Sequence, residues 1–213
     1  MAQGISDESL FGQYCAGATE LLEVLINRYR QELYAFLARF LGDQTLAQDV
    51  FQETFLQVHL SKHTFQQGRA FRPWLFAVAA NKARDAMRVR SRQRTVSLDA
   101  SPSAEKSEHA GRFVELIASD ELAPAAKLSQ AESAEAVRRV IAQVPDHLRE
   151  VLLLAYFQQL PYKEIAEIVG IPLGTVKSRL HSALARFATL WSKASSSVGF
   201  DQPHSAELEG ESE

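Results

Sequence analysis

Basic side chains gather in one part of this chain, although the chain as a whole is slightly acidic. The formal net charge of the 213 residues is −3, yet residues 69–94 hold eight Lys or Arg and a single acid, Asp85. Stabilising a helix dipole takes about two or three cations, so that role does not account for all of them. Aromatic side chains at Phe65, Phe71 and Trp74 lie beside this stripe. Cations next to rings that can stack on bases are typical of a site for single-stranded nucleic acid, although Phe71 and Trp74 also fit a hydrophobic core.

A second set of polar side chains follows a break in a helical pattern, KEIAEIVGIPLGTVKSRL, at residues 163–180. Gly170 can take the positive φ that ends a helix, and Pro172 cannot continue one. Helical periodicity resumes at Thr175, so the pattern predicts a helix-turn-helix. The polar face of its second helix could donate to phosphates and to base edges in the major groove. A helical hairpin with a solvated outer face is the alternative, because short motifs also match by chance.

The sequence contains none of the common arrangements for catalysis or metal binding. Cys15 is the only cysteine and the six histidines are scattered, which excludes an internal disulfide and a cysteine-based metal cluster. No Gly-rich phosphate loop or nucleophile elbow is present. We therefore expect no catalytic residue, no cofactor and no metal, and an enzyme such as a helical hydrolase is the weaker alternative.

Helical periodicity runs through both halves of the chain, and no strand-like alternation persists. Asp43 follows Gly42 at the end of one apolar pattern, and it is suited to cap the next helix. The fold class that the sequence predicts is therefore all-α. The expected helices lie at about residues 18–41, 44–60 and 71–90, and then at 129–144, 145–157, 163–169 and 175–193.

Composition divides these helices into two small domains joined by a flexible linker. The domains are expected over residues 18–94 and 129–193, the second containing the helix-turn-helix. Residues 95–128 are rich in Ser, Ala and Glu and predict a linker, with a short helix over 113–118 as an option. The acidic tail, residues 194–213, is expected to be disordered. The sequence has no signal-peptide pattern and no apolar run of about 20 residues, so we expect a cytoplasmic protein without membrane insertion.

The order of these motifs resembles that of bacterial RNA polymerase sigma factors of the extracytoplasmic-function (ECF) type. DVFQETFLQV, residues 49–58, is similar to the family's polymerase-binding helix, and FRPWLFAVAANKARDAMR, residues 71–88, to the helix that follows its promoter-melting loop. VPDHLREVLLLAYFQQLPYKEIAEIVGIPLGTVKSRLHSAL, residues 144–184, resembles its C-terminal helix-turn-helix. The resemblance covers about residues 18–94 and 129–191.

By position, the resemblance implies three sets of contact residues. The clamp helices of the polymerase's largest subunit would contact Asp49, Gln52, Glu53 and Leu56. The minus-ten element would meet a loop at residues 61–68 and the helix after it, with contacts from Lys62, His63, Phe65, Asn81, Lys82, Arg84 and Arg88. The minus-thirty-five element would meet the helix-turn-helix, with contacts from Tyr162, Thr175, Lys177, Ser178, Arg179, His181 and Ser182.

The function that the resemblance implies is a transcription initiation factor with no chemistry of its own. Its partners would be core RNA polymerase, through the clamp helices and the flap of the second-largest subunit, and promoter DNA; the family also implies an anti-sigma factor. Ala155 and Ser182 stand where family members often carry a basic residue, so we expect weaker contacts there. The rival function is a helix-turn-helix repressor or activator that is not a polymerase subunit. It accounts for residues 129–193 but leaves the basic helix of the first half unexplained.

Overall fold

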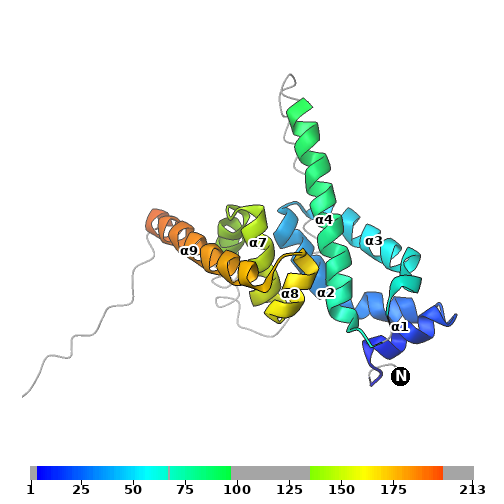
Figure 1. The fold of residues 1–213 in the computed structure, drawn as a ribbon. Coiled ribbons are helices and arrows are strands. Elements are labelled where there is room, and N and C mark those ends of the chain that lie inside the picture. The colour runs from blue at the N-terminus through cyan, green and yellow to red at the C-terminus, as the bar shows by residue number, and fades with distance from the viewer. Residues whose placement is uncertain (1–3, 67, 97–134, 199–213) are drawn as a thin grey trace, which may run out of the picture.

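The computed structural model describes residues 4–66, 68–96 and 135–198, and all regular secondary structure in these ranges is helical, which confirms the predicted fold class (Figure 1). The first part contains α1 (Asp7–Cys15), α2 (Leu21–Leu41), α3 (Gln44–Leu60), η1 (Lys62–Thr64) and α4 (Phe71–Val96). A helix over 135–142 begins the second part, followed by α7 (Asp146–Leu152), η3 (Leu153–Phe157), α8 (Tyr162–Val169) and α9 (Leu173–Val198). The short helix considered at residues 113–118 lies outside the described residues, as do most of the expected linker and tail.

The boundary between α2 and α3 is set by the two residues that the sequence indicates. Gly42 has φ 66°, in the left-handed region, and its N–H donates to the Ala38 carbonyl at 3.1 Å, which closes α2. Asp43 then accepts a hydrogen bond from the Leu46 N–H at 3.0 Å, as the N-cap of α3. These contacts satisfy backbone groups that a helix end would otherwise leave unpaired.

Helix α1 is absent from the sequence prediction, which begins the first helix near residue 18. Ser6 caps α1 by accepting from the Ser9 N–H at 3.2 Å, and Asp7 and Glu8 occupy its first turn. Only Leu10, Phe11 and Tyr14 of its nine residues are buried. The helix is too short, and its apolar stripe too brief, for periodicity to reveal it.

The second part contains the predicted helix-turn-helix, formed by α8 and α9. Gly170 ends α8 at φ 72°, and its N–H donates to the Ala166 carbonyl at 2.9 Å. Pro172 lies between the two helices, and its carbonyl accepts from the Val176 N–H at 3.1 Å in the first turn of α9. Ile165 and Val176 are fully buried. The turn therefore redirects the chain while apolar side chains hold the two helices together.

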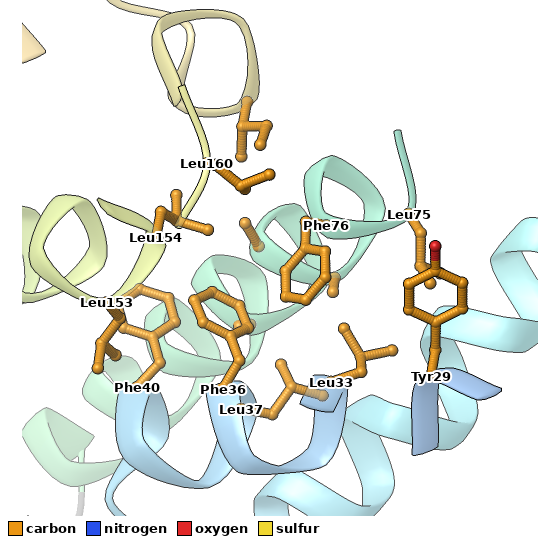
Figure 2. Close-up of a cluster of buried hydrophobic side chains, with 14 of the residues drawn as sticks. Tyr29, Leu33, Phe36, Leu37, Phe40, Leu75, Phe76, Leu153, Leu154 and Leu160 are labelled. Carbon is orange, nitrogen blue, oxygen red and sulfur yellow. The ribbon is translucent and has the colours of Figure 1, made fainter. Parts of the chain in front are cut away.

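The two parts pack against each other through a shared hydrophobic cluster, which the sequence does not predict. Figure 2 shows Phe36 and Phe40 of α2 and Phe76 of α4 gathered with Leu153 and Leu154 of the second part. Both leucines are fully buried, and burying a leucine contributes about 1.5–3 kcal/mol. This contact brings the basic helix α4 against α8. No described helix is long and apolar enough to cross a membrane.

Candidate nucleic-acid interface

The first turns of α9 present a cluster of polar side chains to solvent. Lys177, Ser178, His181 and Ser182 are all exposed, while Val176 and Leu180 point into the core. A helix whose inner face is anchored and whose outer face carries hydrogen-bonding groups can enter a major groove without losing its own packing. Four of the seven residues expected to contact the minus-thirty-five element therefore lie together on an open surface.

The other three residues of that set occupy different environments. Tyr162 begins α8 and is 42% exposed, so its hydroxyl is accessible beside the turn. Thr175 is half-buried, and its carbonyl accepts a hydrogen bond from the Ser178 hydroxyl at 3.1 Å. Arg179 is half-buried and lines a cavity between the two parts of the chain. Arg179 thus faces the first part of the chain more than the open surface of α9.

Helix α4 carries the basic residues expected near the minus-ten element. Asn81 and Arg88 are exposed, Lys82 is half-buried, and Arg88 pairs with Asp85 at 3.0 Å across one turn. The C-terminal portion of α4 extends beyond the packed helices (Figure 1). An exposed pair of this kind is worth only about 0–1 kcal/mol, so Arg88 can exchange Asp85 for a phosphate at little cost.

Among the α4 residues expected to contact the minus-ten element, Arg84 is the one that hydrogen-bonds to the second part of the chain. Its Nη1 lies 3.2 Å from Glu150 Oε1 of α7, and its Nη2 lies 3.5 Å from the Ile168 carbonyl oxygen of α8. Arg84 also donates to Asn81 Oδ1. In this conformation Arg84 is therefore committed to protein partners and is not available to a nucleic acid.

A cavity of about 410 Å³ lies beside this ion pair, between the two parts of the chain. Its charged and titratable wall is formed by Arg84, Arg88, Asp146, His147, Glu150 and Arg179. Burial raises the pKa of Glu150 to about 7, against the opposing effects of Arg84 and Arg179. The carboxyl group of Glu150 is therefore close to half ionised at neutral pH while the two parts remain in contact.

The loop between α3 and α4 holds the remaining residues expected to meet the minus-ten element. His63 is exposed and Lys62 half-buried, with its Nζ 5.3 Å from the centroid of the Tyr14 ring. Phe65 is also half-buried and packs edge-on against Phe11 and Trp74, with ring centroids 5.0 and 5.1 Å away.

The aromatic residues around this loop belong to the core rather than to an open stacking surface. Phe71 is fully buried and Trp74 is 8% exposed, so the core alternative considered for both residues is confirmed. Phe65 anchors the loop to this cluster through its ring. The exposed side chains of residues 61–66 in this loop are polar. Among the loop residues expected to contact the minus-ten element, His63 is the exposed one.

The outward face of α3 carries all four residues expected to contact the polymerase. Asp49, Gln52, Glu53 and Leu56 are exposed and recur at the three- and four-residue steps that place side chains on one helix face. Leu60 continues this face and is 58% exposed, nearly as much as Leu56 at 59%. The sequence prediction omits Leu60, although its four-residue step from Leu56 was a readable signal. Two exposed leucines among carboxylates suit a protein partner.

Comparison with known proteins identifies both parts of the chain. A model of sigma-70 region 2 matches residues 25–94, and a model of sigma-70 region 4 matches residues 134–187. The ECF RNA polymerase sigma factor SigW of Bacillus subtilis is 31% identical over 157 residues, which span 74% of this chain and 81% of SigW. The RNA polymerase sigma-H factor of Pseudomonas aeruginosa is 30% identical over 179 residues, which span 83% of this chain and 89% of that factor.

Two solved structures share the fold. CnrH, in complex with the cytosolic domain of CnrY, has a TM-score of 0.61 at 24% identity, covering 89% of this chain and 99% of CnrH. The sigma factor RpoE of Bartonella quintana, in complex with the anti-sigma factor NepR, has a TM-score of 0.60 at 20% identity, covering 80% of this chain and 96% of RpoE. Together with the sequence matches to regions 2 and 4 in the expected order, these findings show that the chain belongs to the ECF family of RNA polymerase sigma factors.

Proposed function

We propose that this sigma factor binds core RNA polymerase through α3, reads the minus-thirty-five element with α9, and opens the minus-ten element with α4 and the loop before it. The observation that carries the proposal is the position of the three residue sets, each of which presents several members to solvent on a different element. A factor that joins a polymerase to two separate DNA elements needs three such surfaces. A conventional repressor needs only the one on α9.

Recognition of the upstream element follows from the side chains of α9. Lys177, Ser178 and His181 can donate to base edges, while Tyr162 can reach phosphate from the start of α8. Ser182 supplies a short hydroxyl in place of a basic residue, so this interface gains little phosphate attraction at that position.

Promoter opening requires binding energy rather than covalent chemistry. Extruding a base from the duplex costs a few kcal/mol, and capture of the displaced base by the loop would offset this cost. Lys82 and Arg88 would hold the adjacent backbone through phosphate contacts. We propose that the chain has no catalytic residue or cofactor, and that it works in the cytoplasm where the polymerase is.

Polymerase binding is assigned to the exposed face of α3. Leu56 and Leu60 would pack on the clamp helices of the largest subunit, and Asp49, Gln52 and Glu53 would pair with polar groups around them. Region 4 would bind the flap of the second-largest subunit. The exposed face of α3 and the polar cluster on α9 are separate surfaces, so polymerase and promoter could be bound together.

The proposed function requires the two parts of the chain to separate. The two promoter elements lie about 25 base pairs apart, which is roughly 85 Å at ~3.4 Å per base pair. In the structure Arg84 of α4 touches the Ile168 carbonyl of the helix-turn-helix, so both elements cannot be reached at once. We therefore propose that polymerase binds an open form, in which Arg84 leaves Glu150 and becomes free to contact DNA.

An anti-sigma factor is the further partner that we propose. CnrH and RpoE were both solved in complexes, RpoE with the anti-sigma factor NepR, and this chain shares their fold. A protein that binds across α4 and region 4 would stabilise the closed form described here. Such binding would keep Arg84 paired and the two DNA-binding surfaces close together.

Transcription with reconstituted polymerase tests the proposal directly. Core enzyme, the purified chain and a randomised promoter library should yield run-off products enriched for two sequence elements at a fixed spacing. The repressor alternative predicts a different result, namely duplex binding by the chain alone, as a dimer, and no co-purification with core enzyme. Reversing Arg84 and Arg88 to Glu should block open-complex formation more than it weakens core binding.

A further inference from the structure

Helix α1 lies outside the matched region 2, which begins at residue 25, yet it is firmly packed into the first part of the chain. Leu10 and Phe11 are fully buried and Tyr14 is 1% exposed. Asp7 accepts hydrogen bonds from Arg28 and from the Tyr29 hydroxyl, which fixes the start of α1 to α2. Figure 1 shows α1 next to the start of α4. Helix α1 is therefore part of the packed core against which the loop between α3 and α4 lies.

The C-terminal end of that loop is held by Phe11 and Glu8 of α1. The Phe11 ring centroid lies 5.0 Å from that of Phe65 and 4.8 Å from that of Phe71. Glu8 Oε1 accepts a hydrogen bond from the Phe71 N–H at 2.9 Å, at the first residue of α4. A carboxylate is favourable at a helix N-terminus, and this hydrogen bond lowers the pKa of Glu8. One helix thus fixes both the loop aromatic and the point at which α4 begins.

The N-terminal end of the loop is held by Tyr14. Its hydroxyl lies within hydrogen-bonding distance of His59 Nδ1, at 2.5 Å, in the last turn of α3. The Nζ of Lys62 lies over the Tyr14 ring, 5.3 Å from its centroid, at a distance typical of cation–π contacts. The Cys15 thiol approaches the Lys62 carbonyl oxygen at 3.7 Å. The position of Lys62 is therefore set by α1 as well as by the loop itself.

The loop has only a short regular element of its own. The η1 turn spans Lys62–Thr64, and within it the Phe65 N–H donates to the Lys62 carbonyl at 3.3 Å. A single 3₁₀ turn is a weak constraint, so the loop that carries the exposed His63 depends on its contacts with α1 and with the start of α4. Contact residues on a loop gain precision when a second layer of side chains fixes their positions.

We propose that Tyr14 and Phe11 are positioning residues for minus-ten recognition, because they fix the loop that carries Lys62 and His63. This inference rests on the proposed function. Tyr14 and Phe11 themselves are buried, so they would act on DNA only through the loop. Their loss would let the loop sample several positions, and discrimination among minus-ten bases would fall before polymerase binding does.

The test uses the full-length chain with core polymerase and a promoter library randomised only in the minus-ten element. Tyr14→Phe removes the hydroxyl contact with His59 and keeps the ring under Lys62, and Phe11→Leu removes the aromatic contacts with Phe65. Gly12→Ala is the matched control on the same helix, because Gly12 is exposed and an added Cβ meets no atom within 4 Å. Unfolding midpoint, core binding and preference among minus-thirty-five variants are measured alongside.

The expected result is a loss of minus-ten discrimination of roughly threefold in Tyr14→Phe and tenfold in Phe11→Leu, which correspond to about 0.6 and about 1.4 kcal/mol of lost discrimination. Gly12→Ala should match the wild type, and upstream preference should stay unchanged in all variants. Unchanged minus-ten discrimination in a folded Tyr14→Phe chain overturns the inference. So does an equal loss on every promoter that follows the unfolding midpoint. A wild-type chain without promoter selection would instead overturn the proposed function itself.

Discussion

Opening of the two parts should depend on pH through Glu150, which is buried while the two parts are in contact. Its side chain is 4% exposed in the closed form and lies 3.2 Å from Arg84. Burial raises its pKa to about 7 from the ordinary 4.5, although Arg84 and Arg179 oppose the shift. On separation the carboxyl group regains solvent, and its pKa falls toward the ordinary value. Closure is therefore coupled to the uptake of a proton.

The direction and size of the effect follow from linkage. A group whose pKa is higher in the closed form stabilises that form fully at low pH, and the stabilisation is lost as the pH rises through about 7. With pKa values of about 7 closed and about 4.5 open, protonation favours closure by a factor of about 11 at pH 6 and about 1.1 at pH 8. The closed-to-open ratio should fall about tenfold between these values, or roughly 1.4 kcal/mol. The full difference between the two pKa values of Glu150 corresponds to about 3 kcal/mol of stabilisation of the closed form at low pH.

Single-molecule energy transfer measures this ratio directly. Dyes are attached to cysteines introduced at the exposed positions Gln48 of α3 and Ala188 of α9, in a Cys15→Ser background. The Glu150→Gln variant keeps a neutral side chain of the same shape and should abolish most of the pH dependence. His147→Gln is the matched control, because His147 lines the same cavity. An equally pH-dependent Glu150→Gln chain would refute the assignment of the proton to Glu150.

Three further substitutions test the separate surfaces. Lys177→Glu should reduce preference for the upstream element at least tenfold, since a base contact is worth about 1–3 kcal/mol, whereas Lys193→Glu, farther along α9, should not; library transcription measures both. Leu56→Asp should weaken core binding at least tenfold, because burying a leucine is worth about 1.5–3 kcal/mol; binding to labelled core enzyme at an unchanged unfolding midpoint measures this. Asp43→Ala should lower the free energy of unfolding by about 1 kcal/mol through loss of the α3 cap, as measured by urea titration.

Local features of the fold could be predicted from the sequence because single residues determine them. Gly42 and Asp43 end one helix and begin the next through their own backbone and side-chain preferences. Gly170 and Pro172 do the same at the helix-turn-helix. The exposed faces of α3 and α9 followed from helical periodicity, since residues at three- and four-residue steps share a face. These features depend on residues that are close together in the sequence, so they can be predicted from the sequence alone.

Contacts between distant segments could not be predicted in the same way. The apolar run at Leu152–Leu154 indicates burial but does not name Phe36 and Phe40 as its partners. Arg84 reads as one cation among several, and only the structure pairs it with Glu150. Helix α1 escaped prediction because it is short and buries only three of its nine residues, although the Ser6 cap followed by Asp7 and Glu8 was an available signal. Its contacts with the loop between α3 and α4 join segments that are distant in sequence.

We propose that this chain selects promoters only as a subunit of RNA polymerase, through two DNA-binding surfaces that must move apart. The most direct measurement is run-off transcription by reconstituted core enzyme with and without the purified chain, on templates that carry the selected elements at several spacings. Initiation should occur only with the chain present, and it should show a sharp optimum in the spacing between the two elements. Initiation that is independent of the chain, or that needs only one of the two elements at any spacing, would contradict it.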